Sequence, residues 1–157
     1  MSQALLFELG DSTGTIGTFG IDVANVWQVI EPLALKEVPL CPPIVEGIMS
    51  HGGRIVTVVD PSPVLGFTPQ DGEVKQVVIV RDETRPLGNM GLKVSRIRQI
   101  VDMSAMQGAE LPTGPYVERA VQSGTRLIHI IDVVAFMNGL GREFGSAPDA
   151  AREGVTE

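Results

Sequence analysis

Short apolar runs rich in valine and isoleucine recur along the chain, and glycines and prolines separate them. Runs of this length between turn residues are typical of β-strands rather than of long helices. The pattern predicts strands over residues 5–9, 16–21, 33–38, 55–59, 77–80, 92–94, 97–101, 116–122 and 127–131. Such short strands leave unpaired edges unless the sheet closes, and a barrel hides its edges best. We therefore expect a mostly β protein built from barrels.

The sequence also contains an internal repeat. Three segments recur in the same order, 71 or 72 positions apart: residues 20–30 with 91–101, 54–60 with 126–132, and 5–9 with 77–81. This regularity indicates two copies of one small β-rich unit. We expect a first half at about residues 3–72 and a second at about 73–140, with strands able to exchange between the halves.

Asp60 and Asp132 occupy the same place in the repeat, each directly after a strand. An aspartate there accepts hydrogen bonds from the first N–H groups of a helix, so we predict two caps rather than a pair of catalytic carboxylates. The segment after Asp60 fits at most one helical turn, ended by Gly66. After Asp132 we predict a longer helix over residues 133–138, ended by Gly139.

Charge and length narrow the class of protein. The 157 residues carry a formal net charge of −7, which argues against nucleic acid as a partner. No apolar run approaches the roughly 18 residues that cross a bilayer, so we expect a cytoplasmic protein without direct membrane insertion. Cys41 is the only cysteine, which excludes an internal disulfide and favours a small packing residue. Residues 142–157 lack periodicity and are predicted to be a disordered tail.

Signals of catalysis are scarce. The chain has no phosphate-binding loop, no nucleophile elbow and no pair of metal ligands at a familiar spacing. His51 lies in a predicted turn and His129 in the middle of a predicted strand, where ordinary side chains are expected. The glycine-rich stretch 139–145 does not have the spacing of a dinucleotide-binding loop. We expect no catalytic residue, no metal and no cofactor.

Several motifs, in order, resemble the CheW-like coupling proteins of bacterial chemotaxis. They read FGIDV over residues 19–23, VPxxPPIVEGI over 38–48 and GxIVxVVD over 53–60, and the second half continues through 91–97 and the closing segment 127–140. The resemblance covers residues 3–140. It implies a single domain over residues 1–141, made of two similar five-stranded β-barrels of SH3-like type packed around an apolar interface, with short helices and a C-terminal helix.

The resemblance also implies a function. Members of this family are adaptors without chemistry of their own. They couple the cytoplasmic tip of methyl-accepting chemoreceptors to the regulatory domain of a CheA-type histidine kinase, in chemotaxis or a related motility pathway. We therefore expect a cytoplasmic protein at membrane-associated receptor arrays, with other CheW-like proteins as further candidate partners.

The residues that the resemblance assigns to the kinase surface are Val26, Trp27, Gln28 and Val29. Family members usually have glutamate at the position of Gln28, so an ion pair with the kinase would be weaker here. Trp27 has two interpretations. Its spacing with Val26 and Ile30 fits a buried helical face, whereas its counterpart in the repeat is an arginine, which fits an exposed anchor for a partner.

The residues assigned to the receptor surface are Gly52, Gly53 and Arg54. Many family members read Asn-Leu-Arg-Gly where this chain reads Ser-His-Gly-Gly, so the receptor-contacting arginine is replaced by Gly52. Arg54 lies two positions further and would project from the same face of an extended strand. It is a candidate substitute.

Two alternatives follow from these departures. The loss of arginine at Gly52 favours a divergent CheW-like protein that binds the kinase or another CheW-like partner without coupling it to a receptor. A different class is a small β-barrel enzyme or ligand-binding protein, with a polar site between the halves that uses His51 or His129.

Overall fold

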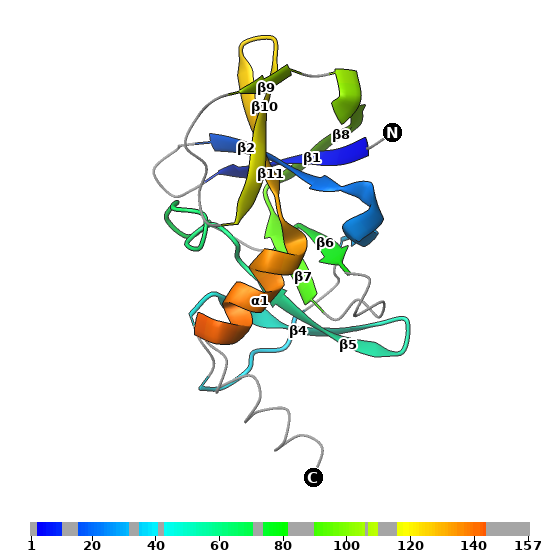
Figure 1. Cartoon of the computed structure of the whole chain (residues 1–157). Coiled ribbons are helices and arrows are strands. Elements are labelled where there is room, and N and C mark those ends of the chain that lie inside the picture. Colours follow the sequence, from blue (N-terminus) through cyan, green and yellow to red (C-terminus); the bar gives the residue numbers. More distant parts are fainter. Residues whose placement is uncertain are drawn as a thin grey trace.

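The computed structural model of the chain describes residues 3–10, 16–31, 35–40, 43–70, 74–81, 90–105, 107–109 and 116–143. In this part the protein is mostly β, with two short 3-10 turns and one α-helix (Figure 1). The strands are β1 (Gln3–Gly10), β2 (Ile16–Asp22), β3 (Val26–Ile30), β4 (Val45–His51), β5 (Arg54–Val59), β6 (Gln76–Val80), β7 (Met90–Val94), β8 (Arg96–Asp102), β9 (Gln107–Ala109), β10 (Val117–Ser123) and β11 (Arg126–Ile131). The 3-10 turns are Val23–Asn25 and Met103–Ala105, and α1 is Val133–Glu143.

The strands form two sheets with matching order. The first sheet runs β8-β1-β2-β11-β10-β9 and the second β3-β6-β7-β5-β4. When strands are matched through the repeat, the first five of the first sheet correspond one by one to those of the second, and β9 is an addition. The predicted fold class, two pseudo-repeated five-stranded units with a C-terminal helix, is confirmed.

The sheets do not coincide with the sequence halves 3–72 and 73–140. Each sheet contains two strands from one copy of the repeat and the remaining strands from the other. Strands of different copies form four pairs: β2 with β11 and β5 with β7 are parallel, and β1 with β8 and β3 with β6 are antiparallel. Because two strands from each copy complete the other copy's sheet, neither copy can satisfy its backbone hydrogen bonds alone.

Alternating side chains build three apolar clusters. In β1, Leu5, Phe7 and Leu9 face the space between the sheets, whereas Ala4 and Leu6 face the interior of the first sheet. In β6, Val78 and Val80 again face the space between the sheets, and the residues before each of them face the interior of the second sheet. This two-residue period on strands buried on both faces explains why their sequences read as continuous apolar runs.

Helix α1 lies where the two sheets meet and packs Val133, Phe136, Met137 and Leu140 into the cluster between them (Figure 1). The Asp132 carboxylate accepts a hydrogen bond from the Ala135 N–H at 3.1 Å, as expected of a cap. No helix in the described part is long and apolar enough to cross a membrane.

The predicted end of this helix at Gly139 is wrong. The helix continues to Glu143, and Gly139 lies inside it with the ring of Tyr116 where a Cβ atom would stand. Gly139 therefore serves close packing rather than termination. The helix takes in the first residues of the predicted disordered tail 142–157, and from residue 144 onward that tail lies outside the described residues, as does Cys41.

Several strand predictions also need correction. β3, β4 and the short β9 were not predicted, because β3 has helix-like spacing and β4 is interrupted by Glu46 and Gly47. A bulge between Val45 and Gly47 accommodates this interruption. The strand predicted over 33–38 is not formed by its described residues, where only Lys36 makes an isolated bridge to Ile48.

The Asp60 carboxylate organises the segment after β5. It is 2% exposed and accepts hydrogen bonds from the Ser62 N–H at 3.0 Å, the Gln70 N–H at 2.8 Å and the Gln70 side-chain amide at 2.7 Å. That amide also donates to the Lys93 carbonyl at 2.8 Å. Asp60 therefore does more than cap a turn, because it fastens the whole segment to β7.

Replacing the two aspartates with alanine should have unequal effects. Asp60→Ala removes an acceptor of three buried hydrogen bonds, and we expect the free energy of unfolding to fall by about 3 kcal/mol or more. Asp132→Ala, the matched variant at the equivalent place in the repeat, removes a single cap and should cost about 1 kcal/mol. Urea denaturation of both variants measures the difference. Equal losses would contradict this account.

Candidate functional site

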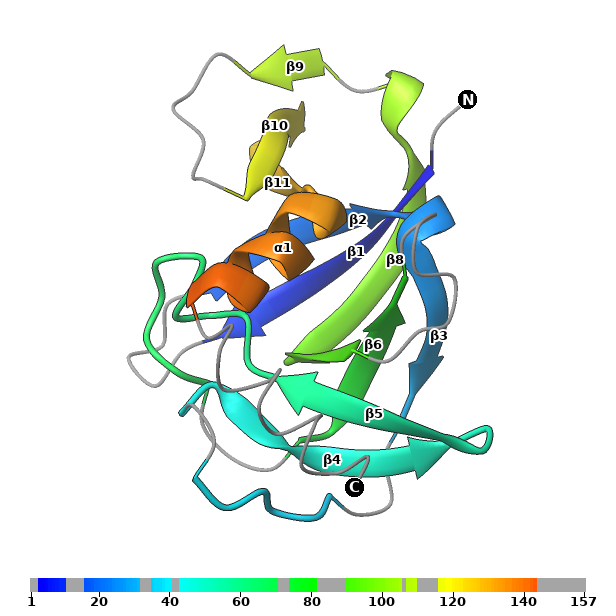
Figure 2. The same cartoon turned by 60° about the horizontal axis from the view of Figure 1, so that its bottom comes forward.

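The second sheet curls until its two edges approach one another. β3 and β4 stand at opposite ends of its strand order, yet the His51 Nε2 and Gln28 Oε1 atoms lie 2.8 Å apart. The bridge between Lys36 and Ile48 also lays the chain after β3 against β4. Figure 2 shows β3 running towards the β4–β5 hairpin. This closure brings together residues that the sequence assigned to two different partners.

Trp27 has both a buried and an accessible side. A bulge between Val26 and Gln28 in the pairing of β3 with β6 lets Trp27 and Ile30 both pack against the interior cluster of the second sheet. On its other side the Arg54 guanidinium lies 5.2 Å from the ring centroid, a cation–π contact. The His51 ring meets the indole edge-on at 6.3 Å. The helical interpretation is wrong, but the burial that it implied is partly present.

We call Trp27, Gln28, His51 and Arg54 the β3–hairpin cluster. Apolar side chains lie next to it in sequence on both strands: Val29 is 38% exposed and Ile55 is 61% exposed. Strand register places Val29, opposite Val78, and Ile55, which alternates with Val56, on the face of the sheet away from the interior cluster. An aromatic ring and an arginine close in sequence to exposed apolar side chains have the composition of a protein-binding surface. The arrangement can bind a partner.

The other residues that the resemblance assigned to partner surfaces, Val26, Gly52 and Gly53, lie outside this cluster. Val26 packs against the cluster between the sheets, away from Trp27. Gly52 and Gly53 form the turn of the β4–β5 hairpin with φ angles of 59° and 77°. Two successive positive φ angles define the tight hairpin turn in which glycine is strongly favoured. The backbone angle at position 52 thus gives a reason for glycine there that is independent of any partner.

The two histidines have separate surroundings, and acidic and histidine side chains do not cluster in the described part. No three His, Cys, Asp or Glu side chains of the described residues gather to hold a metal ion. His51 contacts Gln28, and the ring of His129, in β11, lies 5.6 Å from that of Phe19. Apolar side chains fill the space between the sheets, so a polar site there is not found in the described part.

Comparison with known proteins agrees with this architecture. The family model described as a CheW-like domain matches residues 3–140. The chain belongs to the CheW-like family. The chemotaxis protein CheW of Thermotoga maritima is 24% identical over 132 residues, which cover 83% of this chain and 84% of that protein.

A solved structure supports the fold of this CheW-like chain. The scaffolding protein TtCheW from Thermoanaerobacter tengcongensis superposes with a TM-score of 0.67 at 20% identity, covering 83% of this chain and 88% of the other. At this identity the likeness concerns the fold. The contacts of the β3–hairpin cluster belong to this chain's own side chains.

Sequence reasoning found Trp27 and Arg54 separately but missed the contact between them. It also did not place His51 next to Gln28 and Trp27. The exposure of Ile55 was missed because Arg54–Asp60 reads as a nearly continuous apolar run. The alternation of exposed Ile55 with buried Val56 becomes visible only once the strand's faces are assigned.

Trp27→Ala should lower the free energy of unfolding by roughly 2 kcal/mol, about half the loss for a fully buried tryptophan, because only one side of the ring packs on the core. Val29→Ala is the matched variant on the same strand and should change stability by no more than about 0.5 kcal/mol. Chemical denaturation measures both. If Trp27→Ala is as harmless as Val29→Ala, the indole does not contribute to the interior cluster.

Proposed function

We propose that this protein is a non-enzymatic scaffold that couples methyl-accepting chemoreceptors to a CheA-type histidine kinase in chemotaxis or a related motility pathway. The observation that carries the proposal is the CheW-like family model, which matches nearly the whole described fold over residues 3–140. We place the protein in the cytoplasm, at membrane-associated receptor arrays. No step of the proposed function requires a cofactor.

The β3–hairpin cluster is our proposed kinase-binding surface. Val29 supplies an accessible apolar side chain, and Trp27 supplies a rigid aromatic anchor. Gln28 is engaged with His51 and carries no charge, so an apolar contact rather than an ion pair would dominate at this position. The expected partner is the regulatory domain of the kinase, and other CheW-like domains are candidates for the same surface.

Arg54 is our proposed substitute for the arginine missing at Gly52. Its guanidinium lies over the Trp27 ring, which holds a cation in a fixed place beside the hairpin turn. A receptor tip that presents a carboxylate near an apolar side chain would complement it. Gly52 and Gly53 would allow close approach, because nothing lies within 4 Å of the positions where their Cβ atoms would be.

A second candidate function is a CheW-like protein that binds the kinase without the receptor. The observation that favours it is the glycine turn, which leaves no side chain at the hairpin tip. Purified kinase regulatory domain and receptor signalling fragment, each tested for binding to the full chain, separate the candidates. Kinase binding alone favours the second candidate, binding of both favours the coupling scaffold, and binding of neither contradicts both.

The kinase surface can be tested with Val29→Asp. A carboxylate placed in an apolar contact should weaken kinase binding at least about tenfold, because the charge loses its water on association. Val134→Asp is the matched control, since Val134 on α1 is 42% exposed against 38% for Val29. Isothermal titration with the regulatory domain measures both. Equal affinities for the two variants would remove Val29 from the surface.

The role of Arg54 can be tested separately. Arg54→Ala should weaken binding of the receptor fragment by about tenfold, as expected for loss of a charge-assisted hydrogen bond. Arg54→Lys should recover part of the affinity, because it keeps the charge without the planar stacking. Arg119→Ala, at an exposed position of β10, controls for net charge. Unchanged binding of Arg54→Ala in sedimentation with receptor fragments contradicts this assignment.

A further inference from the structure

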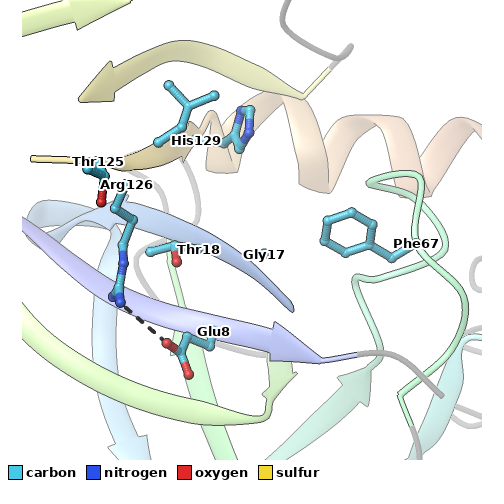
Figure 3. Close-up of a pocket in the computed structure, with 8 residues that line it drawn as sticks. Glu8, Gly17, Thr18, Phe67, Thr125, Arg126 and His129 are labelled. Atoms are coloured by element: carbon cyan, nitrogen blue, oxygen red, sulfur yellow. Dashed lines mark ion pairs between the residues drawn. The ribbon is translucent and has the colours of Figure 1, made fainter. Parts of the chain in front are cut away.

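A cleft opens at one end of the first sheet, away from the β3–hairpin cluster. Its volume is about 590 Å³, and it lies between β1, β2, β11 and the segment after β5 (Figure 3). Its lining residues are Glu8, Gly17, Thr18, Phe67, Thr125, Arg126, Leu127 and His129. The volume lies within the range of pockets that take small molecules.

The apolar wall of the cleft is held in place by packing. A Cβ atom on Gly17 would stand 2.5 Å from the Phe67 ring, so the glycine is what lets this ring lie against β2. The Phe67 ring meets Phe19 edge-on at 5.6 Å, and Phe19 in turn lies 5.6 Å from the ring of His129. A wall fixed by such contacts is already arranged before a ligand arrives.

On its charged side the cleft is lined by one carboxylate, Glu8, and one guanidinium, Arg126, and Arg98 contacts the same carboxylate from outside the lining. The Glu8 Oε2 atom lies 3.3 Å from Nη1 of Arg98 and 3.9 Å from Nη1 of Arg126. One carboxylate thus faces two guanidinium groups, in a protein whose formal net charge is −7. The Arg126 side chain is 45% exposed and keeps hydrogen-bonding capacity beyond this ion pair.

Two further polar groups line the cleft. The structure shows no hydrogen bond between the ring nitrogens of His129 and any described residue, although this ring lies beside Phe19. Thr18 is 8% exposed and borders the same space. In Figure 3 Arg126 points towards Glu8, while Phe67 and His129 lie on the other side of the cleft. Strand register puts Glu8 and Thr18 on the same face of the sheet as Ile128, and His129 on the other face with Phe19. A ligand that lies across the ends of these strands could place one end on the arginine and the other on the aromatic wall.

The internal repeat shows that this chemistry belongs to one copy only. Its spacing aligns Arg126 with Arg54, Arg98 with Trp27 and Glu8 with Val80. In the second sheet, Arg54 covers the indole of Trp27, which packs on the interior cluster. In the first sheet the counterparts of these two residues meet a carboxylate instead. The charged cleft is thus no general consequence of the fold.

We propose that this cleft binds a small organic anion, a carboxylate or a phosphate monoester attached to an apolar or aromatic group. The anionic group accepts hydrogen bonds from the planar fork of Arg126, which matches carboxylate and phosphate oxygens. The apolar group lies against Phe67 and Leu127. His129 and Thr18 are in reach as further hydrogen-bonding groups. This inference does not depend on the proposed coupling function.

The test is a titration of the isotope-labelled full chain, followed by two-dimensional amide NMR. Benzoate and phenyl phosphate should give saturable shifts at residues that line the cleft, with millimolar or tighter affinity. Benzamide, the uncharged counterpart of benzoate, and inorganic phosphate, which lacks the apolar group, should each bind at least about tenfold more weakly. Shifts with inorganic phosphate equal to those with phenyl phosphate would refute a role for the aromatic wall, and with it the ligand class.

Variants distinguish this site from unspecific attraction to positive charge. Arg126→Gln should weaken benzoate binding at least about tenfold, whereas Lys75→Gln removes one positive charge at an exposed position just before β6 and should leave it unchanged. The dispersion of the amide spectrum confirms that each variant is folded. Equal loss in both variants, or no saturable shift at the cleft for the unmodified chain, would overturn the proposal.

Discussion

The parallel pairing of strands from different copies of the repeat is the constraint on which the rest of the structure depends. Thr18–Ile21 pair with Ile128–Ile131, and Thr57–Val59 pair with Met90–Leu92. Without these pairs β2 and β5 would each lose a neighbour in the middle of a sheet, and their buried backbone groups would have no partner. The two copies are therefore expected to form one cooperative unit, reinforced by the apolar cluster between the sheets and by helix α1.

A rigid unit of this kind is suited to a scaffold protein, which acts by binding other proteins. Strands buried on both faces leave little freedom for one sheet to move against the other, because the side chains between them are closely packed. Partners that dock on different faces are then kept at a fixed separation. In the proposed function, binding energy would come from surface side chains that the core does not need, such as the exposed Val29. Specificity can change at these positions without loss of the fold.

The repeat makes this division between core and surface visible. Both copies keep the apolar strand positions and the aspartate that follows the last strand. The accessible ends have diverged, so that Trp27 with Arg54 stands in one copy where Arg98 with Arg126 stands in the other. A duplicated scaffold has thus produced two chemically different surfaces. We propose an apolar partner for the first and an anion for the second.

The glycines show most clearly where local sequence signals reach their limit. Gly139 follows a predicted helix as a stop signal would, yet the helix passes through it because Tyr116 occupies the adjacent space. Gly52 and Gly53, assigned to a partner by resemblance, are needed by the turn itself. A glycine in a sequence indicates that something excludes a side chain. Only the neighbours in space show whether that is a backbone angle, an aromatic ring or a ligand.

The sequence by itself determined the β class, the duplication, the capping aspartates and the family. Each of these depends on residue type and on spacing along the chain, which are local quantities. The tertiary structure decided the exchange of strands between copies, the strand rather than helix around Trp27, and the contacts of both surfaces. Gln28 and His51 are 23 positions apart, and Glu8 and Arg98 are 90 positions apart. Such pairs meet only through strand register and sheet closure, which depend on the whole set of hydrogen bonds and buried contacts rather than on any local pattern.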